Sequence, residues 1–159
     1  MYGTIVVEPA GGLKPVDKEY QITQSEFYTK EGAAKGETME FSYEAGLDER
    51  PSHVVYNGHM TSMVKNPLKA KAGETVRIFF TNVGPNFVDS FQLLEQPFDR
   101  VYTEGSFAAP PAENVKVTKV PTGGAVMVEF KVKTAGTYTL VDPVGNRKDL
   151  GAMGLLKVD

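Results

Sequence analysis

Apolar and polar residues alternate with a period of two along much of this chain, the pattern of half-buried β-strands. The alternation is clearest in two segments, whose apolar positions are Val76, Ile78 and Phe80 in the first and Val126, Val128, Phe130 and Val132 in the second. Weaker or shorter examples predict further strands at residues 4–7, 20–23, 53–56, 115–120, 138–140 and 156–158. No segment of comparable length has the 3.6-residue period of an amphipathic helix.

Turn-forming pairs separate these segments, among them Asn57-Gly58, Gly84-Pro85 and Gly123-Gly124. Closely spaced strands with turns between them predict an all-β fold, an antiparallel β-sandwich. We see no internal repeat, so residues 1–159 are expected to form a single domain.

Two parts of this domain are irregular. Residues 1–16 are expected to form a leading arm and linker, and residues 29–51 a long polar loop of the kind that is often functional or interface-forming. The best helix candidate lies inside that loop, at residues 31–41. It contains Gly32 and Gly36, so we predict an exposed loop with at most one helical turn there.

Composition removes several functional classes. The net charge is −3 and like charges are scattered, which argues against nucleic acid as a partner. No apolar run approaches the length of a membrane helix, so no membrane partner is expected, and the first residues do not read as a signal peptide. The absence of cysteine excludes disulfides, thiolate catalysis and thiolate metal sites. Gly-rich phosphate loops and a Gly-x-Ser-x-Gly elbow are also missing.

Several segments resemble, in the right order, the second (C-terminal) cupredoxin domain of copper-containing nitrite reductases. They include MYGTIVVEPAGGL, HVVYNG, LKAKAGETVRIFFTNVGPNFVDSF, GTYTLVD and GAMGLLKVD. The resemblance covers nearly the whole chain and implies a cupredoxin-type Greek-key β-sandwich. It also implies a periplasmic homotrimer, in which each subunit has a first cupredoxin domain with a type 1 copper. The type 2 copper of that family lies between subunits, bound by two histidines of a first domain and one of a neighbour's second domain.

The resemblance also locates the two functional histidines of the second domain. The copper ligand follows Leu-Val-Asp in the family, and here Pro143 follows Asp142. The proton-relay histidine follows Ser-Phe, and here Gln92 follows Phe91. Proline has no side-chain donor atom, and glutamine does not titrate near neutral pH. We therefore expect no catalytic, cofactor-binding or metal-binding residue in this chain, and no copper of its own.

Other candidate ligands are few. A type 1 copper needs two histidines, a cysteine and a weak axial methionine. Asp142 stands near the cysteine place, no histidine follows it, and Met153 stands near the methionine place, where we expect a core side chain. His53 and His59 flank the Asn57-Gly58 turn and are expected to be surface or edge residues, since a two-histidine copper site would be weak without a third ligand. The carboxylate pairs Asp48-Glu49 and Asp142 with Asp149 are expected to be solvated loop charges.

These observations predict a non-catalytic domain with a structural, trimer-forming role, which is not an enzyme by itself. Two alternatives stay open. The chain could be a fragment of a two-domain copper oxidoreductase, similar to nitrite reductases or multicopper oxidases, whose first cupredoxin domain supplies the metal ligands. It could also be an engineered trimeric scaffold.

Overall fold

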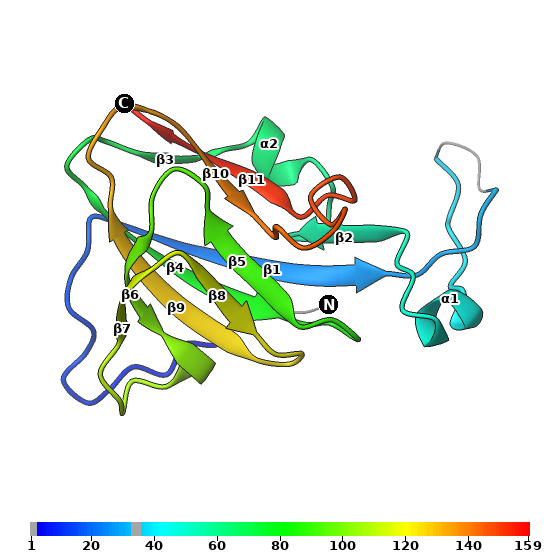
Figure 1. Ribbon diagram of the computed structural model, residues 1–159, viewed down its shortest axis with the longest axis horizontal. Helices are drawn as coiled ribbons and strands as arrows, with labels where there is room; N and C mark the ends of the chain where they lie inside the picture. The colour runs from blue at the N-terminus through cyan, green and yellow to red at the C-terminus, as the bar shows by residue number, and fades with distance from the viewer. Residues whose placement is uncertain (1–2, 33–35) are drawn as a thin grey trace.

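The computed structural model describes residues 3–32 and 36–159, and in them the strands form two sheets that face each other (Figure 1). The first sheet has the order β2-β1-β4-β9-β6-β7. Its strands are β1 (Lys18–Phe27), β2 (His53–Tyr56), β4 (Thr75–Asn82), β6 (Phe98–Tyr102), β7 (Ala112–Val115) and β9 (Ala125–Lys131). The second sheet has the order β3-β11-β10-β5-β8. Its strands are β3 (Leu68–Ala70), β5 (Asp89–Leu93), β8 (Val117–Val120), β10 (Gly136–Val141) and β11 (Met153–Val158).

The predicted all-β sandwich is confirmed, but not all of its strands are antiparallel. β1 runs parallel to β4, and β3 runs parallel to β11, whereas the other neighbouring strands are antiparallel. An alternating pattern reports which face of a strand is buried and carries no information about the direction of its neighbour. The sequence therefore predicted the layers correctly and the strand directions only in part.

The strand predicted at residues 4–7 is wrong. These residues form no ladder and instead lie over the outer face of the first sheet, where the Thr4 and Thr81 hydroxyls are 2.7 Å apart. Their alternation is that of an extended segment with one side against the sheet, since Ile5 and Val7 point to solvent. The segment predicted at 53–56 coincides with β2, and the one at 115–120 is divided between β7 and β8. The strands β3, β5 and β6 were not predicted.

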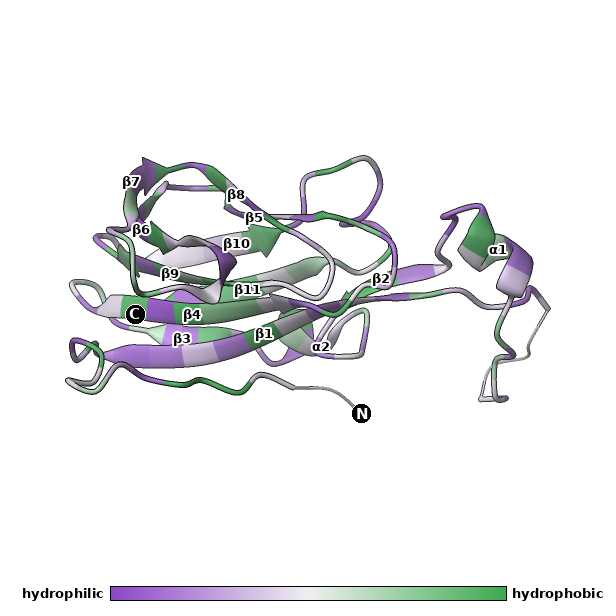
Figure 2. Ribbon diagram, turned by 90° about the horizontal axis from the view of Figure 1, so that it is seen from below, coloured by the Kyte–Doolittle hydropathy of each residue, from purple (hydrophilic) through white to green (hydrophobic). Residues whose placement is uncertain are grey.

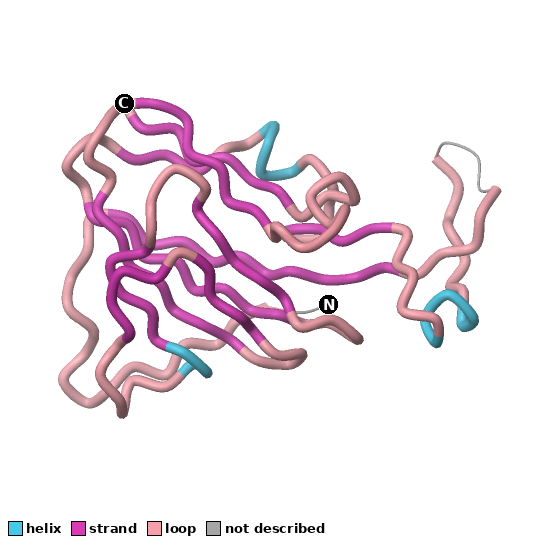
Figure 3. The backbone as a smooth tube through the Cα atoms, in the orientation of Figure 1, coloured by secondary structure: helices cyan, strands magenta, loops and turns pink. Residues whose placement is uncertain are grey.

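Residues 29–32 and 36–51 leave the sandwich as a projecting arm, which extends β1 and β2 beyond the body of the molecule (Figures 1 and 3). The described part of the helix candidate at 31–41 is not helical, and residues 33–35 of that candidate lie outside the described residues. A short helix, α1 (Tyr43–Leu47), follows it, with the Ala45 N–H donating to the Ser42 hydroxyl at the N-cap. The other short elements are α2 (Ser62–Lys65) and the 3₁₀ turn η1 (Thr103–Gly105).

A row of buried aromatic rings joins the two sheets. Phe80 of β4 stacks on Phe91 of β5 with ring centroids 4.2 Å apart, and Phe91 in turn stacks on Phe98 at 5.5 Å. Tyr56 of β2 meets Phe80 and Phe91 edge-on, at 5.9 and 6.4 Å. Offset and edge-on pairs of this kind add to the stabilisation from apolar burial alone. No helix in the described ranges is long and apolar enough to cross a membrane.

Candidate functional site

The two positions at which sequence reasoning expected missing histidines lie close together. Gln92, the last residue but one of β5, pairs with Val141 of β10, which lies two residues before Pro143. Phe91 and Leu93 are fully buried in the core, so Gln92 lies on the outer face of the second sheet, where it is partly exposed. Pro143 is exposed just beyond the end of β10. An amide and a proline therefore occupy one outer corner of the sandwich.

Copper does not fit this corner with donors from this chain. Both type 1 and type 2 copper need imidazole ligands, and type 1 copper also needs a thiolate. Gln92 and Pro143 supply neither. In the described residues no group of three or more His, Cys, Asp or Glu side chains could hold a metal ion.

Asp142, which precedes Pro143, is not the solvated loop charge that the sequence suggested. Its carboxylate is fully buried. Oδ1 accepts the Val144 N–H at 3.0 Å, and Oδ2 accepts from the Ser90 N–H at 3.3 Å and from the Arg147 guanidinium at 2.9 Å. Arg147 also donates to the Val88 carbonyl at 2.9 Å. Asp142 thus anchors the loop at residues 143–152, while Asp149 in that loop is exposed, as expected.

A second buried carboxyl lies on the inner side of the same corner. Asp89, at the start of β5, and Asp142, at the end of β10, both receive a hydrogen bond from one amide group, Gln24 Nε2 of the opposite sheet, at 2.6 and 2.9 Å. Tyr56 pairs with Gln24 across the β1–β2 ladder and is also fully buried. Burial, reinforced by the charge of Asp142, raises the pKa of Asp89 to about 8.

Sequence reasoning missed this cluster. Gln24 and Asp89 are 65 positions apart and belong to different sheets, so only the folded chain brings them together. One signal was present, because Gln24 and Glu26 follow Ile22 at core-facing positions of a strand. Polar residues at such positions are rarely buried without hydrogen-bonding partners.

Glu26 connects this end of the sandwich to the projecting arm. Its carboxylate accepts hydrogen bonds from the Tyr28 hydroxyl and from the backbone N–H groups of Asn86 and Phe87, the latter two at 3.2 and 2.7 Å. Asn86 Nδ2 then donates to the carbonyl of Gly46 in α1, at 2.8 Å. The base of the arm is therefore fixed to the turn that precedes β5.

His53 and His59 lie around one hollow on the outer side of β2, together with Met39 and Met60. His59 Nδ1 accepts the Thr61 N–H at 3.1 Å, so this nitrogen is already used. His53 Nδ1 is buried and has no hydrogen-bond partner in the described part of the chain. Met153 is partly exposed at the start of β11, which corrects the expectation of a core side chain there. The buried positions of β11 are Gly154, Leu156 and Val158, so Met153 lies on the other face of the strand.

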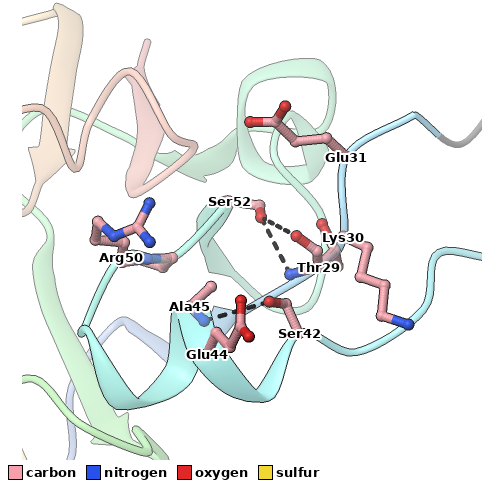
Figure 4. A pocket seen from close by; sticks show the side chains of 9 residues that line it. Thr29, Lys30, Glu31, Ser42, Glu44, Ala45, Arg50 and Ser52 are labelled. Carbon is pink, nitrogen blue, oxygen red and sulfur yellow. Dashed lines mark hydrogen bonds between the residues drawn. The ribbon is translucent and has the colours of Figure 1, made fainter.

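A polar hollow lies within the arm (Figure 4). Ser52 bridges its two sides, accepting the Thr29 N–H at 3.1 Å and donating to the Thr29 carbonyl at 3.2 Å. The charged groups do not converge, since Figure 4 shows Lys30 and Arg50 on opposite sides of the hollow. Each of these cations pairs with a carboxylate, Glu40 and Asp48 respectively, in exposed ion pairs. The hollow is therefore a structural feature of the arm.

Comparison with known proteins gives a consistent result over the whole chain. No family model matches it. The sequence is 48% identical over 161 residues to a copper-containing nitrite reductase of Neisseria gonorrhoeae, covering 100% of this chain and 41% of that protein. It is 33% identical to a copper-containing nitrite reductase of Pseudomonas chlororaphis, covering 96% of this chain and 44% of that protein. The chain thus spans about two fifths of the length of these relatives.

Solved structures agree. The copper nitrite reductase of Thermus scotoductus superposes with a TM-score of 0.80 at 25% identity, covering 92% of this chain and 32% of that one. The copper nitrite reductase of Nitrosomonas europaea gives 0.77 at 27% identity, covering 92% and 50%. A multicopper oxidase with a TM-score of 0.78 at 23% identity shares the fold. Over its whole length, therefore, this chain is a homologue of part of the copper-containing nitrite reductases, folded as a single cupredoxin-like two-sheet β-sandwich.

Proposed function

We propose that this chain is a non-catalytic cupredoxin-like domain, related to the second domain of copper nitrite reductases, that assembles as a homotrimer. In this role it forms one wall of a site whose metal ligands come from other domains. The observation that carries the proposal is the corner formed by Gln92 and Pro143. Similarity to copper nitrite reductases runs through this corner, yet Pro143 has no side-chain donor for copper and Gln92 cannot transfer a proton at neutral pH.

The projecting arm supports the trimer-forming part of the proposal. Its apolar side chains are unusually exposed, with Phe41 at 64%, Tyr43 at 69% and Leu47 at 67%. They lie on and beside α1, which Figure 2 shows in the projecting arm, beyond the ends of both sheets. Exposed aromatic and aliphatic side chains gathered on one protruding element are typical of a surface that another chain covers. A second and a third copy of this chain would bury them.

The oligomeric state tests this part directly. We expect sedimentation velocity at micromolar concentration to give a trimer. Replacing Phe41, Tyr43 and Leu47 together by serine should weaken the association by at least about tenfold, because central apolar anchors carry most of the binding free energy. A matched control is the pair Val88→Ser and Leu94→Ser, which removes exposed apolar side chains outside the arm. A monomeric parent protein, or equal weakening by the control, contradicts the proposal.

Copper content and activity test the non-catalytic part. The purified chain is expected to retain no tightly bound copper after dialysis and to reduce no nitrite with an artificial electron donor. One tight copper per chain, found by elemental analysis, would overturn this assignment.

The chain matches only about two fifths of the length of its relatives, and this observation favours a second candidate function. In this case the domain works within a copper oxidoreductase whose first cupredoxin domain holds the redox metal. Adding a separately expressed first domain of a relative tests it. If the candidate is correct, the mixture should bind copper and reduce nitrite, and Pro143→His should raise that activity at least about tenfold by supplying an imidazole ligand. An inactive mixture with both the parent chain and Pro143→His argues for the structural role alone.

A further inference from the structure

We infer that Asp89 holds a proton at neutral pH, that this proton joins Asp89 to Gln24 as a carboxylic acid–amide pair, and that its loss at alkaline pH loosens the corner of the sandwich that carries loop 143–152. The inference concerns the inner side of the corner and is independent of the proposed function.

The hydrogen bonds around the Gln24 amide favour a proton on Asp89. Both N–H groups of the Gln24 amide are already used, one on Asp89 Oδ1 and one on Asp142 Oδ2. Three polar oxygens of the same cluster then remain buried without a partner in the described chain: Gln24 Oε1, Asp89 Oδ2 and the Tyr56 hydroxyl. With Asp89 ionised, Gln24 Oε1 and Asp89 Oδ2 can only accept hydrogen bonds, so neither can satisfy the other. A proton on Oδ2 turns that atom into a donor for Gln24 Oε1.

The charges around Asp89 also favour its protonated form. Asp142, which directly follows β10, faces it across Gln24, and Arg147 faces it from the loop. Glu26 on β1 adds a further negative charge, and Tyr56 on β2 is neutral because burial raises its pKa. One guanidinium therefore lies beside two fully buried carboxyls, and it is hydrogen-bonded to only one of them, Asp142. A second ionised carboxylate at this depth would be left without a counter-ion, which burial strongly disfavours.

Loop 143–152 is the element that this proton controls. Asp142 holds the loop through Val144 and Arg147, and the Arg147 guanidinium also lies 4.1 Å from the centre of the Phe87 ring. If Asp89 loses its proton, its carboxylate repels Asp142 and competes with it for Arg147. The loop contacts that depend on Asp142 then weaken. The raised pKa of Asp89, about 8, agrees with a transition just above neutral pH.

The sign of the effect on stability follows from the direction of the shift. The folded state binds the Asp89 proton more tightly than the unfolded chain does. This contribution is therefore fully present below about pH 4 and is lost as the pH rises towards 8. Across that window the equilibrium constant for unfolding should rise by about tenfold per pH unit from this group alone.

The test compares the wild type with Asp89→Asn, whose amide has the shape of the protonated acid and can donate to Gln24 Oε1. Urea unfolding is measured from pH 5 to pH 7.5. Over this range the equilibrium constant for unfolding of the wild type, divided by that of the variant, should rise by about tenfold per pH unit. Asp149→Asn, which removes an exposed carboxylate of the same loop, should keep the wild-type slope. Equal slopes for the wild type and Asp89→Asn overturn the inference.

A measurement on the wild type removes the dependence on a variant that folds. Carbon-13 NMR of the aspartate side-chain carboxyls, assigned through the backbone, should show the Asp89 resonance titrating between about pH 7 and 9. The amide resonances of Val144 and Arg147 should shift with the same midpoint. Titration of Asp89 near pH 4, its ordinary range, contradicts the inference.

Discussion

Replacing Arg77 by methionine should lower the free energy of unfolding by about 3–5 kcal/mol, among the largest single losses in this protein. The guanidinium lies on the outer face of the first sheet yet is only 4% exposed, and its partner Glu129 is 7% exposed. Arg77 donates to Glu129 Oε1 through Nε and Nη2, at 2.9 and 2.6 Å. Methionine fills the space but leaves the Glu129 carboxylate buried, with Arg100 at 3.6 Å as its remaining cation.

The size of this effect depends on the neighbours of Arg77 across the sheet. Glu19, Arg77, Glu129 and Arg100 are directly opposite one another on β1, β4, β9 and β6, so that positive and negative side chains alternate over four strands. Arg77 also donates to the Lys14 carbonyl at 2.6 Å, which fastens the N-terminal segment over the row. Loss of the guanidinium therefore removes the main counter-ion of the buried Glu129 carboxylate. It also removes the hydrogen bond that holds the N-terminal segment over the row.

Two further variants separate these contributions in urea denaturation. Arg77→Met with Glu129→Leu should recover most of the loss, because a buried ion pair replaced by apolar residues of similar volume is often neutral. Glu19→Gln should cost less than about 1 kcal/mol, since Glu19 is half exposed. A loss below about 1 kcal/mol for Arg77→Met would show that solvent reaches Glu129 and that the row is an ordinary surface network.

The burial of this row could not be predicted from the sequence. Alternation correctly placed Val76, Ile78 and Phe80 on the core face of β4, which puts Arg77 on the outer face, where a charged residue is expected to be solvated. It is buried because residues 3–16 cover the outer face, whereas the pattern at 4–7 predicted another strand. Periodicity along one segment cannot report what a distant segment covers.

The candidate site divides in the same way. The outer corner could be reached from the sequence, because Gln92 and Pro143 sit next to recognisable local motifs, Ser-Phe and Leu-Val-Asp. The inner cluster could not, since its hydrogen bonds join residues 65 and 118 positions apart. Asp142 belongs to both parts. Its local motif was visible, and its burial was not.

Phe91→Ala should also lower the free energy of unfolding by about 3–5 kcal/mol, through a cavity in the core. Phe91 of the second sheet is fully buried against three rings of the first sheet, with Phe80 and Phe98 stacked on it and Tyr56 edge-on. These partners are held by three different strands, so they cannot move in to fill the space without breaking ladder hydrogen bonds. The cost should therefore fall near the upper end of the range for Phe to Ala.

Two controls make this result interpretable in thermal and urea unfolding. Phe91→Leu keeps an apolar side chain of intermediate size and should cost roughly half as much, as expected when the loss scales with cavity volume. Leu94→Ala, three positions further along the chain at an exposed site, should change stability by less than about 0.5 kcal/mol. If Phe91→Ala cost no more than Leu94→Ala, the stacked rings would not be the element that holds the two sheets together, and the polar contacts at the Asp89–Asp142 corner would have to carry that role.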